Sequence, residues 1–167
     1  REQCLKLNIG WIVDADVSGF FDNLDHGLLR KFIKQRVNDG GILRLIGKWL
    51  KAGVLEGEQI TYPERGTPQG GVISPLLANI YLHEVLDSWF DQRVKPRLHG
   101  RATLVRYADD AVIGFTDRGD AERVLEALTK RCAEYGLELH PEKTRLVPFR
   151  RPSGKSGGNG PESGQKP

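Results

Sequence analysis

The feature that most constrains the fold is a pair of adjacent aspartates, Asp109 and Asp110, between two short strand-like segments. The segment before them is ATLVRY (102–107), and the segment after them is AVIGF (111–115). Both are rich in β-branched or aromatic residues, and only an Ala-Asp-Asp turn separates them. The sequence therefore predicts a tight β-hairpin that displays two carboxylates at its tip.

A single aspartate is common in such a turn, but two neighbouring carboxylates repel each other, and a cation between them relieves the repulsion. Hard divalent ions such as Mg²⁺ prefer a few carboxylate oxygens and keep other positions for water or phosphate. A carboxylate pair on a rigid hairpin therefore indicates metal-assisted phosphoryl or nucleotidyl transfer.

The 167 residues fit one domain, and 38% hydrophobic with 28% charged residues is ordinary for a globular protein. No apolar run is long enough to cross a bilayer, and no signal-peptide pattern opens the chain. The two cysteines, Cys4 and Cys132, suggest no disulfide framework. These features favour an intracellular protein without a membrane partner. Because the chain has no methionine and begins at Arg1, we interpret it as a fragment of a longer protein.

The net charge of +3 does not describe a protein that is basic throughout. Residues 150–167 contain four Lys or Arg and one Glu, so they carry the whole excess, and residues 1–149 are formally neutral. Any nucleic-acid site must therefore be local. Gly, Ser, Pro and Lys dominate residues 150–167, which are expected to form a flexible linker or tail.

Hydrophobic periodicity and turn residues predict an α+β fold. Besides the hairpin, a buried strand is expected over residues 9–14, with short strands near 137–140 and 144–149. Residues 53–71 contain five glycines and two prolines and should form a loop or an irregular hairpin. Helices are expected over 25–37 with Asp25 as N-cap, 42–50, 74–90 with Ser74 as N-cap, and 119–135.

The three tryptophans lie on apolar faces of these predicted elements, and we expect them in the core rather than as stacking platforms. They are Trp11, Trp49 and Trp89. Trp49 belongs to the second helix, whose amphipathic pattern is also marked by Ile42, Leu45, Ile46 and Leu50.

A second acidic cluster contains Asp14 and Asp16, which at period two face the same side of the first strand. One interpretation is that these aspartates cap helices and form turns. The other is that one of them joins Asp109 and Asp110 in a three-carboxylate cage for two Mg²⁺ ions. A third segment, RGTPQGGVISP (65–75), has glycines that let backbone approach a ligand closely. The helix after it points its positive end toward this loop, which suits phosphates or a template strand, although such loops are often only turns.

Taken together and in this order, these segments resemble the palm of a reverse transcriptase of the group II intron type found in bacteria. The resemblance spans residues 9–149. It implies an α+β polymerase palm over residues 1–149, without fingers and thumb, whose antiparallel sheet carries the hairpin and packs on helices. The matching stretches are DADVSGFFDNLDH (14–26), RGTPQGGVISPLLANIYL (65–82), YADD (107–110) and GLELHPEKTRLV (136–147).

The resemblance implies that Asp16, Asp109 and Asp110 are the catalytic metal ligands, with Asp14 a neighbour and not a ligand. They would hold two Mg²⁺ ions, for which Mn²⁺ can substitute. Lys143 resembles a lysine proposed to protonate the leaving pyrophosphate; the alternative is a solvated surface lysine.

The resemblance also implies contacts to nucleotide and template. Phe21 resembles an aromatic residue under the incoming sugar, whose ring would clash with a ribose 2′-hydroxyl. The alternative is that it packs in the core with Phe20. Gln69, with Gly70 and Arg65, would lie near the nucleotide and template; the alternative for Gln69 is a solvent-exposed amide. Tyr107 would pack beneath the primer terminus, or is a plain strand tyrosine.

The function implied is RNA-directed DNA synthesis with an RNA template, a DNA primer and dNTPs, and with the host intron RNA as a further partner. The isolated fragment is expected to be inactive. Alternatives are a maturase that assists intron RNA folding and splicing, a reverse transcriptase of retrons, diversity-generating elements or phage defence, and a degenerate remnant.

Overall fold

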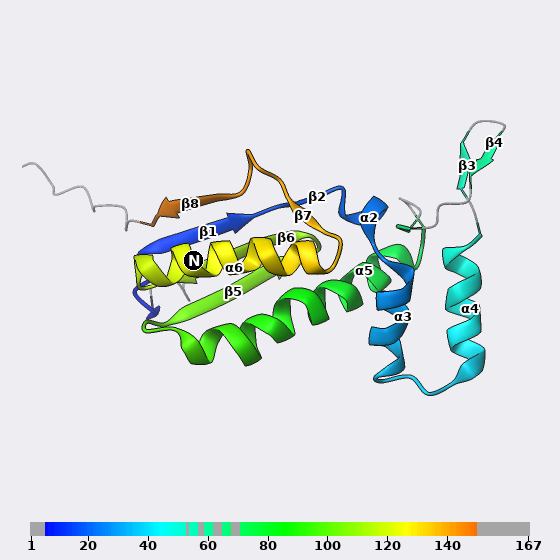
Figure 1. The fold of residues 1–167 in the computed structure, drawn as a ribbon, viewed down its shortest axis with the longest axis horizontal. Coiled ribbons are helices and arrows are strands. Elements are labelled where there is room, and N and C mark those ends of the chain that lie inside the picture. Colours follow the sequence, from blue (N-terminus) through cyan, green and yellow to red (C-terminus); the bar gives the residue numbers. More distant parts are fainter. Residues whose placement is uncertain (1–5, 53, 57–58, 62–64, 68–70, 150–167) are drawn as a thin grey trace, which may run out of the picture.

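The computed structural model describes residues 6–52, 54–56, 59–61, 65–67 and 71–149 (Figure 1). Its centre is a four-stranded antiparallel sheet with the order β5-β6-β1-β8. The strands are β1 (Trp11–Ala15), β5 (Ala102–Tyr107), β6 (Asp110–Phe115) and β8 (Arg145–Pro148). Two smaller ladders pair β2 (Val17–Ser18) with β7 (Glu138–Leu139) and β3 (Val54–Glu56) with β4 (Gln59–Thr61). The predicted α+β fold with an antiparallel sheet is confirmed.

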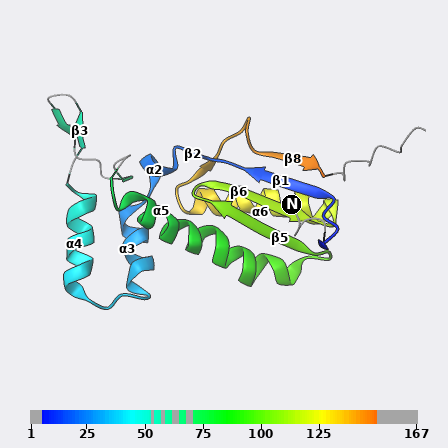
Figure 2. The same cartoon turned by 180° about the vertical axis from the view of Figure 1, so that it is seen from behind.

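One face of the sheet is covered by α6 (Arg118–Glu134), which contacts β1, β6 and β8. Figure 1 shows α6 in front of the sheet, and Figure 2 shows it behind the strands. Val13, Ala15, Ala111 and Ile113 alternate with more exposed residues and are buried. The opposite face is open where Val105 and Val112 are exposed. The sheet therefore has one face buried under α6 and one face accessible to solvent.

A long helical segment begins at α5 (Ser74–Leu82) and continues through η1 (His83–Asp87), η2 (Phe90–Val94) and η3 (Lys95–Arg97). It runs beneath β5 in Figure 1. The helix predicted over 74–90 therefore extends further than its sequence pattern indicates. Ser74 is its first residue rather than its N-cap, since Ile73 holds the capping position.

The helices α3 (His26–Lys34) and α4 (Gly40–Leu50) form a helical hairpin at one end of the molecule, and a short helix, α2 (Phe20–Asn23), precedes them (Figure 1). The Asp25 side chain accepts a 2.8 Å hydrogen bond from the Leu28 amide, which confirms the predicted N-cap. Asp39 caps α4 in the same way through the amides of Gly41 and Ile42.

The expectation that Trp49 packs in the core is wrong. Its residue exposure is 42%, and the exposures of Ile42 and Leu45 are 48% and 45%, whereas Leu43 and Leu50 are buried. The reason is that α4 packs against α3 and lies at the periphery of the molecule, so part of its apolar surface stays exposed among the described residues. Trp11 and Trp89 are partly buried against the core, as expected.

None of the helices in the described part of the chain is long and apolar enough to cross a membrane. The expected tail, residues 150–167, lies outside the described residues.

Candidate active site

The aspartate hairpin has a two-residue turn, Ala108-Asp109, because Tyr107 and Asp110 form the last pair of the β5–β6 ladder. Ala108 adopts a positive φ of 53°, which is uncommon for a residue with a Cβ. Such a conformation persists only when the surrounding structure holds it in place. Asp109 is half-buried in this turn and Asp110 is exposed at the start of β6.

Arg106 supplies that restraint, and sequence reasoning missed it. Its Nη1 donates to the Ala108 carbonyl at 2.7 Å and to Asn79 Oδ1 at 2.9 Å. Its Nε and Nη2 donate to the two carboxylate oxygens of Asp87 at 2.8 and 2.7 Å. Because the Arg106 side chain is only 11% exposed, it ties the Ala108-Asp109 turn to the long helical segment with little competition from water.

The sheet register brings Asp16 beside the hairpin. Ala15 pairs with Ala111 as the last pair of β1 and β6, so the next positions along the two chains are Asp16 and Asp110. Paired residues of an antiparallel ladder point to the same face of the sheet, and so do residues two positions apart on one strand. Asp16 and Asp110 therefore lie on the same face as the pair formed by Asp14 and Val112. The register therefore places Asp16 beside Asp110, and so next to the Asp109-Asp110 turn, at one end of the open face.

These side chains offer the donor type that Mg²⁺ prefers. In the described residues, however, no three His, Cys, Asp or Glu side chains are close enough to each other to form a metal-binding group. The carboxylates fit such an ion in chemical type and in their place in the sheet. Their oxygens would have to move closer together to coordinate it.

Lys143 lies on Asp16: its Nζ is 3.1 Å from Asp16 Oδ2. The neighbouring backbone joins the two segments, because the His140 amide donates to the Asp16 carbonyl at 2.8 Å and the Thr144 hydroxyl to the same carbonyl at 3.4 Å. The Lys143 side chain is 62% exposed, so this ion pair contributes little to stability. It does place the Lys143 ammonium group beside Asp16, which is an expected metal ligand. Asp14, by contrast, faces Arg145, with 3.6 Å between Oδ2 and Nε.

The glycine-rich loop contacts the segment after Asp16. The Thr67 amide donates to the Phe21 carbonyl and the Gly66 amide to the Leu24 carbonyl, both at 2.7 Å. Gly66 has φ of +82°, and a Cβ there would lie 2.6 Å from the Phe21 carbonyl oxygen. Glycine is therefore required at this position.

Phe21 is half-buried and contacts Phe20 edge to face, with ring centroids 5.4 Å apart. Arg65 is exposed, while Gln69 and Gly70 lie outside the described residues. Tyr107 is 83% exposed and, as the partner of Asp110, shares the open face. The described site residues thus fall into two groups: the carboxylates with Lys143 and Tyr107, and Phe21 with the loop start at Arg65.

The chain matches known proteins along most of its length. Residues 3–155 match the family model described as reverse transcriptase (RNA-dependent DNA polymerase). Protein YkfC of Escherichia coli is 33% identical over 86% of this chain and 45% of its own length. The group II intron-encoded protein LtrA of Lactococcus lactis is 52% identical over 75 residues, which are 45% of this chain and 12% of LtrA.

Among solved structures, apo telomerase from Candida tropicalis, truncated from its C-terminal domain, superposes with a TM-score of 0.68 at 16% identity. The match covers 92% of this chain and 34% of the telomerase chain, and it supports the polymerase palm fold. The chain thus spans less than half the length of each of these three relatives. Because the family model matches nearly the whole chain, the chain belongs to the reverse transcriptase family.

Proposed function

We propose that this chain is the catalytic palm of an RNA-directed DNA polymerase of a group II intron-like element. The observation that carries the proposal is the register of β1 and β6, which brings Asp16 to the Asp109-Asp110 turn. An RNA template, a DNA primer and dNTPs would be the substrates, and the similarity to an intron-encoded protein supports an intron RNA as a further partner.

Asp16, Asp109 and Asp110 would hold two Mg²⁺ ions, with Mn²⁺ able to substitute. Bound there, the ions would supply activation of the primer 3′-hydroxyl and neutralisation of the departing pyrophosphate. Lys143, already beside Asp16, would hold a proton near the leaving group. The exposed Tyr107 ring on the same face would support the primer terminus.

Phe21 would act on the sugar of the incoming nucleotide. The Thr67 amide bound to its carbonyl holds its backbone, and its ring contacts Phe20 edge to face. The ring would clash with a ribose 2′-hydroxyl where a deoxyribose would not. Arg65, Gln69 and Gly70 would contact nucleotide and template from the neighbouring loop.

The test is extension of a DNA primer on an RNA template by the polypeptide of full natural length that carries these residues. Asp109→Asn should lower the rate by at least about a hundredfold, since a catalytic metal contributes several kcal/mol to the transition state. Asp14→Asn is the matched control, because Asp14 lies on the same strand but faces Arg145. A rate near wild type for Asp109→Asn, in a protein that melts normally, would contradict the catalytic assignment.

A further inference from the structure

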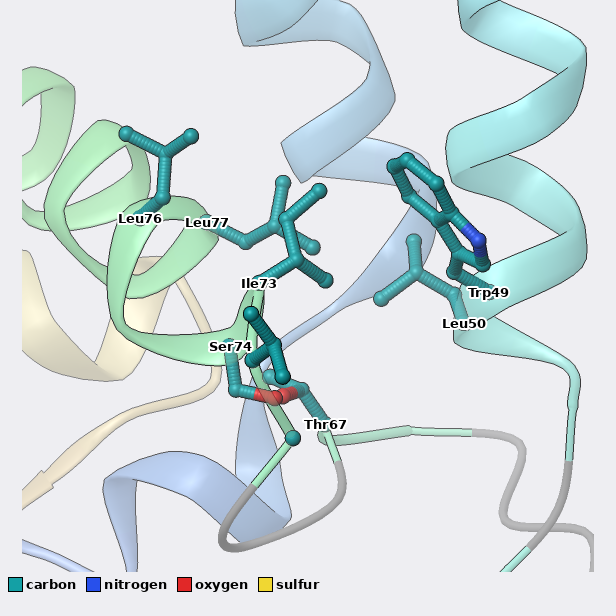
Figure 3. A pocket seen from close by; sticks show the side chains of 9 residues that line it. Trp49, Leu50, Thr67, Ile73, Ser74, Leu76 and Leu77 are labelled. Carbon is teal, nitrogen blue, oxygen red and sulfur yellow. The ribbon is translucent and has the colours of Figure 1, made fainter.

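Two cavities of similar volume differ in their chemistry. The cavity between α4 and the start of α5 has a volume of about 590 Å³ and is lined by uncharged, largely apolar residues; Figure 3 shows Trp49 facing Ile73 across it. The second cavity, of about 520 Å³, lies where the long helical segment meets α6. Arg93, Arg97 and Arg131 line the second cavity, and we call it the arginine pocket. Of the two, it is the arginine pocket that offers charge to a ligand.

The charge of the arginine pocket is not neutralised by its neighbours. Arg93 and Arg97 are exposed, and neither makes an ion pair within the described residues. Arg97 instead donates to the Arg93 carbonyl, which keeps its side chain beside Arg93. Glu84 is the one acid among the described lining residues, and it pairs with Arg36 of α3 at 3.5 Å. Three arginines and one glutamate give the pocket a net charge of +2.

Arg131 is held in place and still has N–H donors to offer. Its Nε donates to the Val85 carbonyl at 3.1 Å and its Nη2 to the Glu84 carbonyl at 3.4 Å, while its guanidinium carbon lies 4.3 Å from the centre of the Tyr135 ring. Its Nη1 makes no hydrogen bond within the described part of the chain and lies 3.7 Å from a Glu134 carboxylate oxygen. The Arg131 side chain is 21% exposed, so water reaches these donors poorly. A largely buried guanidinium with unused N–H groups favours an anion.

The backbone beside the pocket is unusual. Both η1 and η2 are π-helical turns: the Ser88 amide donates to the His83 carbonyl, and the Lys95 amide donates to the Phe90 carbonyl. Such turns are rare and occur frequently at functional sites. Residues of both turns line the arginine pocket, so the irregular backbone coincides with the cluster of cations.

The free charge is confined to the pocket, which favours a small ligand over a long nucleic acid. On the helical segment Lys95 pairs with Asp91, and on α6 Lys130 pairs with Glu126, both at 2.6 Å. A nucleic acid strand needs a row of free cations along its backbone, and these neutralised neighbours do not supply one. The arginines therefore suit one compact oxyanion, and guanidinium groups bind phosphate in a two-pronged geometry. A phosphate monoester carries a charge of about −1.5 to −2 at neutral pH, which complements the pocket.

The other lining residues fit a base attached to that phosphate. Trp89 is half-buried and lines the pocket, so it presents an apolar ring to a planar group. Gln92 is exposed and adds an amide that can both donate to and accept from the edge of a base. Inorganic phosphate would leave Trp89 and Gln92 unused. The cavity volume of about 520 Å³ lies within the usual range for small ligands.

We propose that the arginine pocket binds a nucleoside 5′-monophosphate. Arg93, Arg97 and Arg131 bind the phosphate. Trp89 packs against the base, and Gln92 bonds its edge. The pocket lies beside α6, whereas the aspartates lie on the sheet face that α6 leaves open, so this nucleotide is distinct from the one that would react at the aspartates. The inference does not depend on the proposed function.

The experiment is isothermal titration calorimetry of adenosine 5′-monophosphate into the whole chain without Mg²⁺. Replacing Arg93 and Arg97 together by Gln should weaken binding about tenfold or more, because each hydrogen bond to a charged group accounts for about that factor. Arg131→Lys keeps the charge but loses the fork, and should also weaken binding. Trp89→Leu should weaken binding about 5- to 150-fold, the effect of losing one stacked base, and leave the affinity for inorganic phosphate unchanged.

The matched control replaces Arg30 and Arg44 by Gln, which are exposed arginines of α3 and α4 without an ion pair in the described part of the chain. It removes the same charge and should bind adenosine 5′-monophosphate like the wild type. So should Asp109→Asn, because the proposed catalytic centre takes no part in this binding. A failure of primer extension therefore leaves the result unaffected. Melting curves confirm that each variant is folded.

Several results would overturn the proposal. They are the absence of saturable binding, equal losses in the two double-arginine variants, and a loss in Asp109→Asn. Inorganic phosphate or tetraglutamate bound as tightly as adenosine 5′-monophosphate would reveal a site for any compact anion. A 5′-phosphorylated oligoadenylate bound more tightly through the same arginines would make the pocket part of a nucleic-acid surface.

Discussion

Removing the Arg106 side chain should release the Ala108-Asp109 turn from the long helical segment that carries Asn79 and Asp87. Arg106→Ala deletes the bidentate pair with Asp87 and the hydrogen bonds to Asn79 and to the Ala108 carbonyl. The Asp87 carboxylate is only 25% exposed, so it would lose its best partner in a poorly solvated position. A net hydrogen bond to a charged group contributes about 1.5–3 kcal/mol, and partial exposure reduces the total, so we expect a loss of about 2–4 kcal/mol in the free energy of unfolding.

The assay is urea or thermal unfolding of Arg106→Ala, Asp87→Asn and the double variant. If the two side chains act through each other, the losses should not add, and the coupling free energy should exceed about 1 kcal/mol. Lys130→Ala is the control, because its ion pair with Glu126 is equally short but highly exposed, so its removal should lower the free energy of unfolding far less than Arg106→Ala does.

Arg106→Lys separates charge from geometry, since a lysine keeps the charge but cannot form the two-pronged contact. It should recover less than half of the lost stability. Strictly additive losses in the cycle, or an Arg106→Ala variant as stable as the wild type, would refute the view that this arginine restrains the strained Ala108 turn.

Other outcomes follow from single contacts. Gly66→Ala should destabilise the protein by more than about 3 kcal/mol in thermal unfolding, because its Cβ would meet the Phe21 carbonyl at 2.6 Å; Gly10→Ala, with no atom within 4 Å, should change stability by less than about 1 kcal/mol. Burial raises the pKa of Cys132 from 9.0 to about 11 and that of Tyr81 from 10.0 to about 12. The folded state therefore favours the neutral thiol and the neutral phenol, and this contribution to the free energy of unfolding is complete below pH 9 and is lost as pH rises to about 12. Cys132→Ala should flatten the lower part of this decline in stability, measured by unfolding at several pH values. A variant with the same pH profile as the wild type would contradict the assignment.

Much of the fold follows from local patterns. The strand before Asp14, the hairpin and the end of α6 at Gly136 were predictable because alternation, turn residues and a glycine at positive φ act within a few residues. The cap at Asp25 is equally local. The meeting of Asp16 with the hairpin could be expected only from the family resemblance, since no periodicity fixes which strands pair.

What the sequence could not predict depends on distant partners. The role of Arg106 requires Asp87 and Asn79 on another element, and a lone arginine in a strand does not identify them. The apolar face of α4 reads as core because periodicity shows that a face is apolar but not whether anything covers it. Summed charge likewise conceals the arginine pocket, because acidic residues elsewhere cancel its charge.

The central claim is that Asp16 and the Asp109-Asp110 turn form one metal-dependent centre. The most direct measurement is titration of the chain with Mn²⁺, followed by electron paramagnetic resonance, for the wild type, Asp16→Asn, Asp109→Asn and Asp14→Asn. We predict that Asp16→Asn and Asp109→Asn each weaken Mn²⁺ binding about tenfold or more, because each removes a charged ligand of the same centre, while Asp14→Asn leaves it nearly unchanged. Equal binding by all four proteins, or a loss confined to Asp14→Asn, would contradict the account.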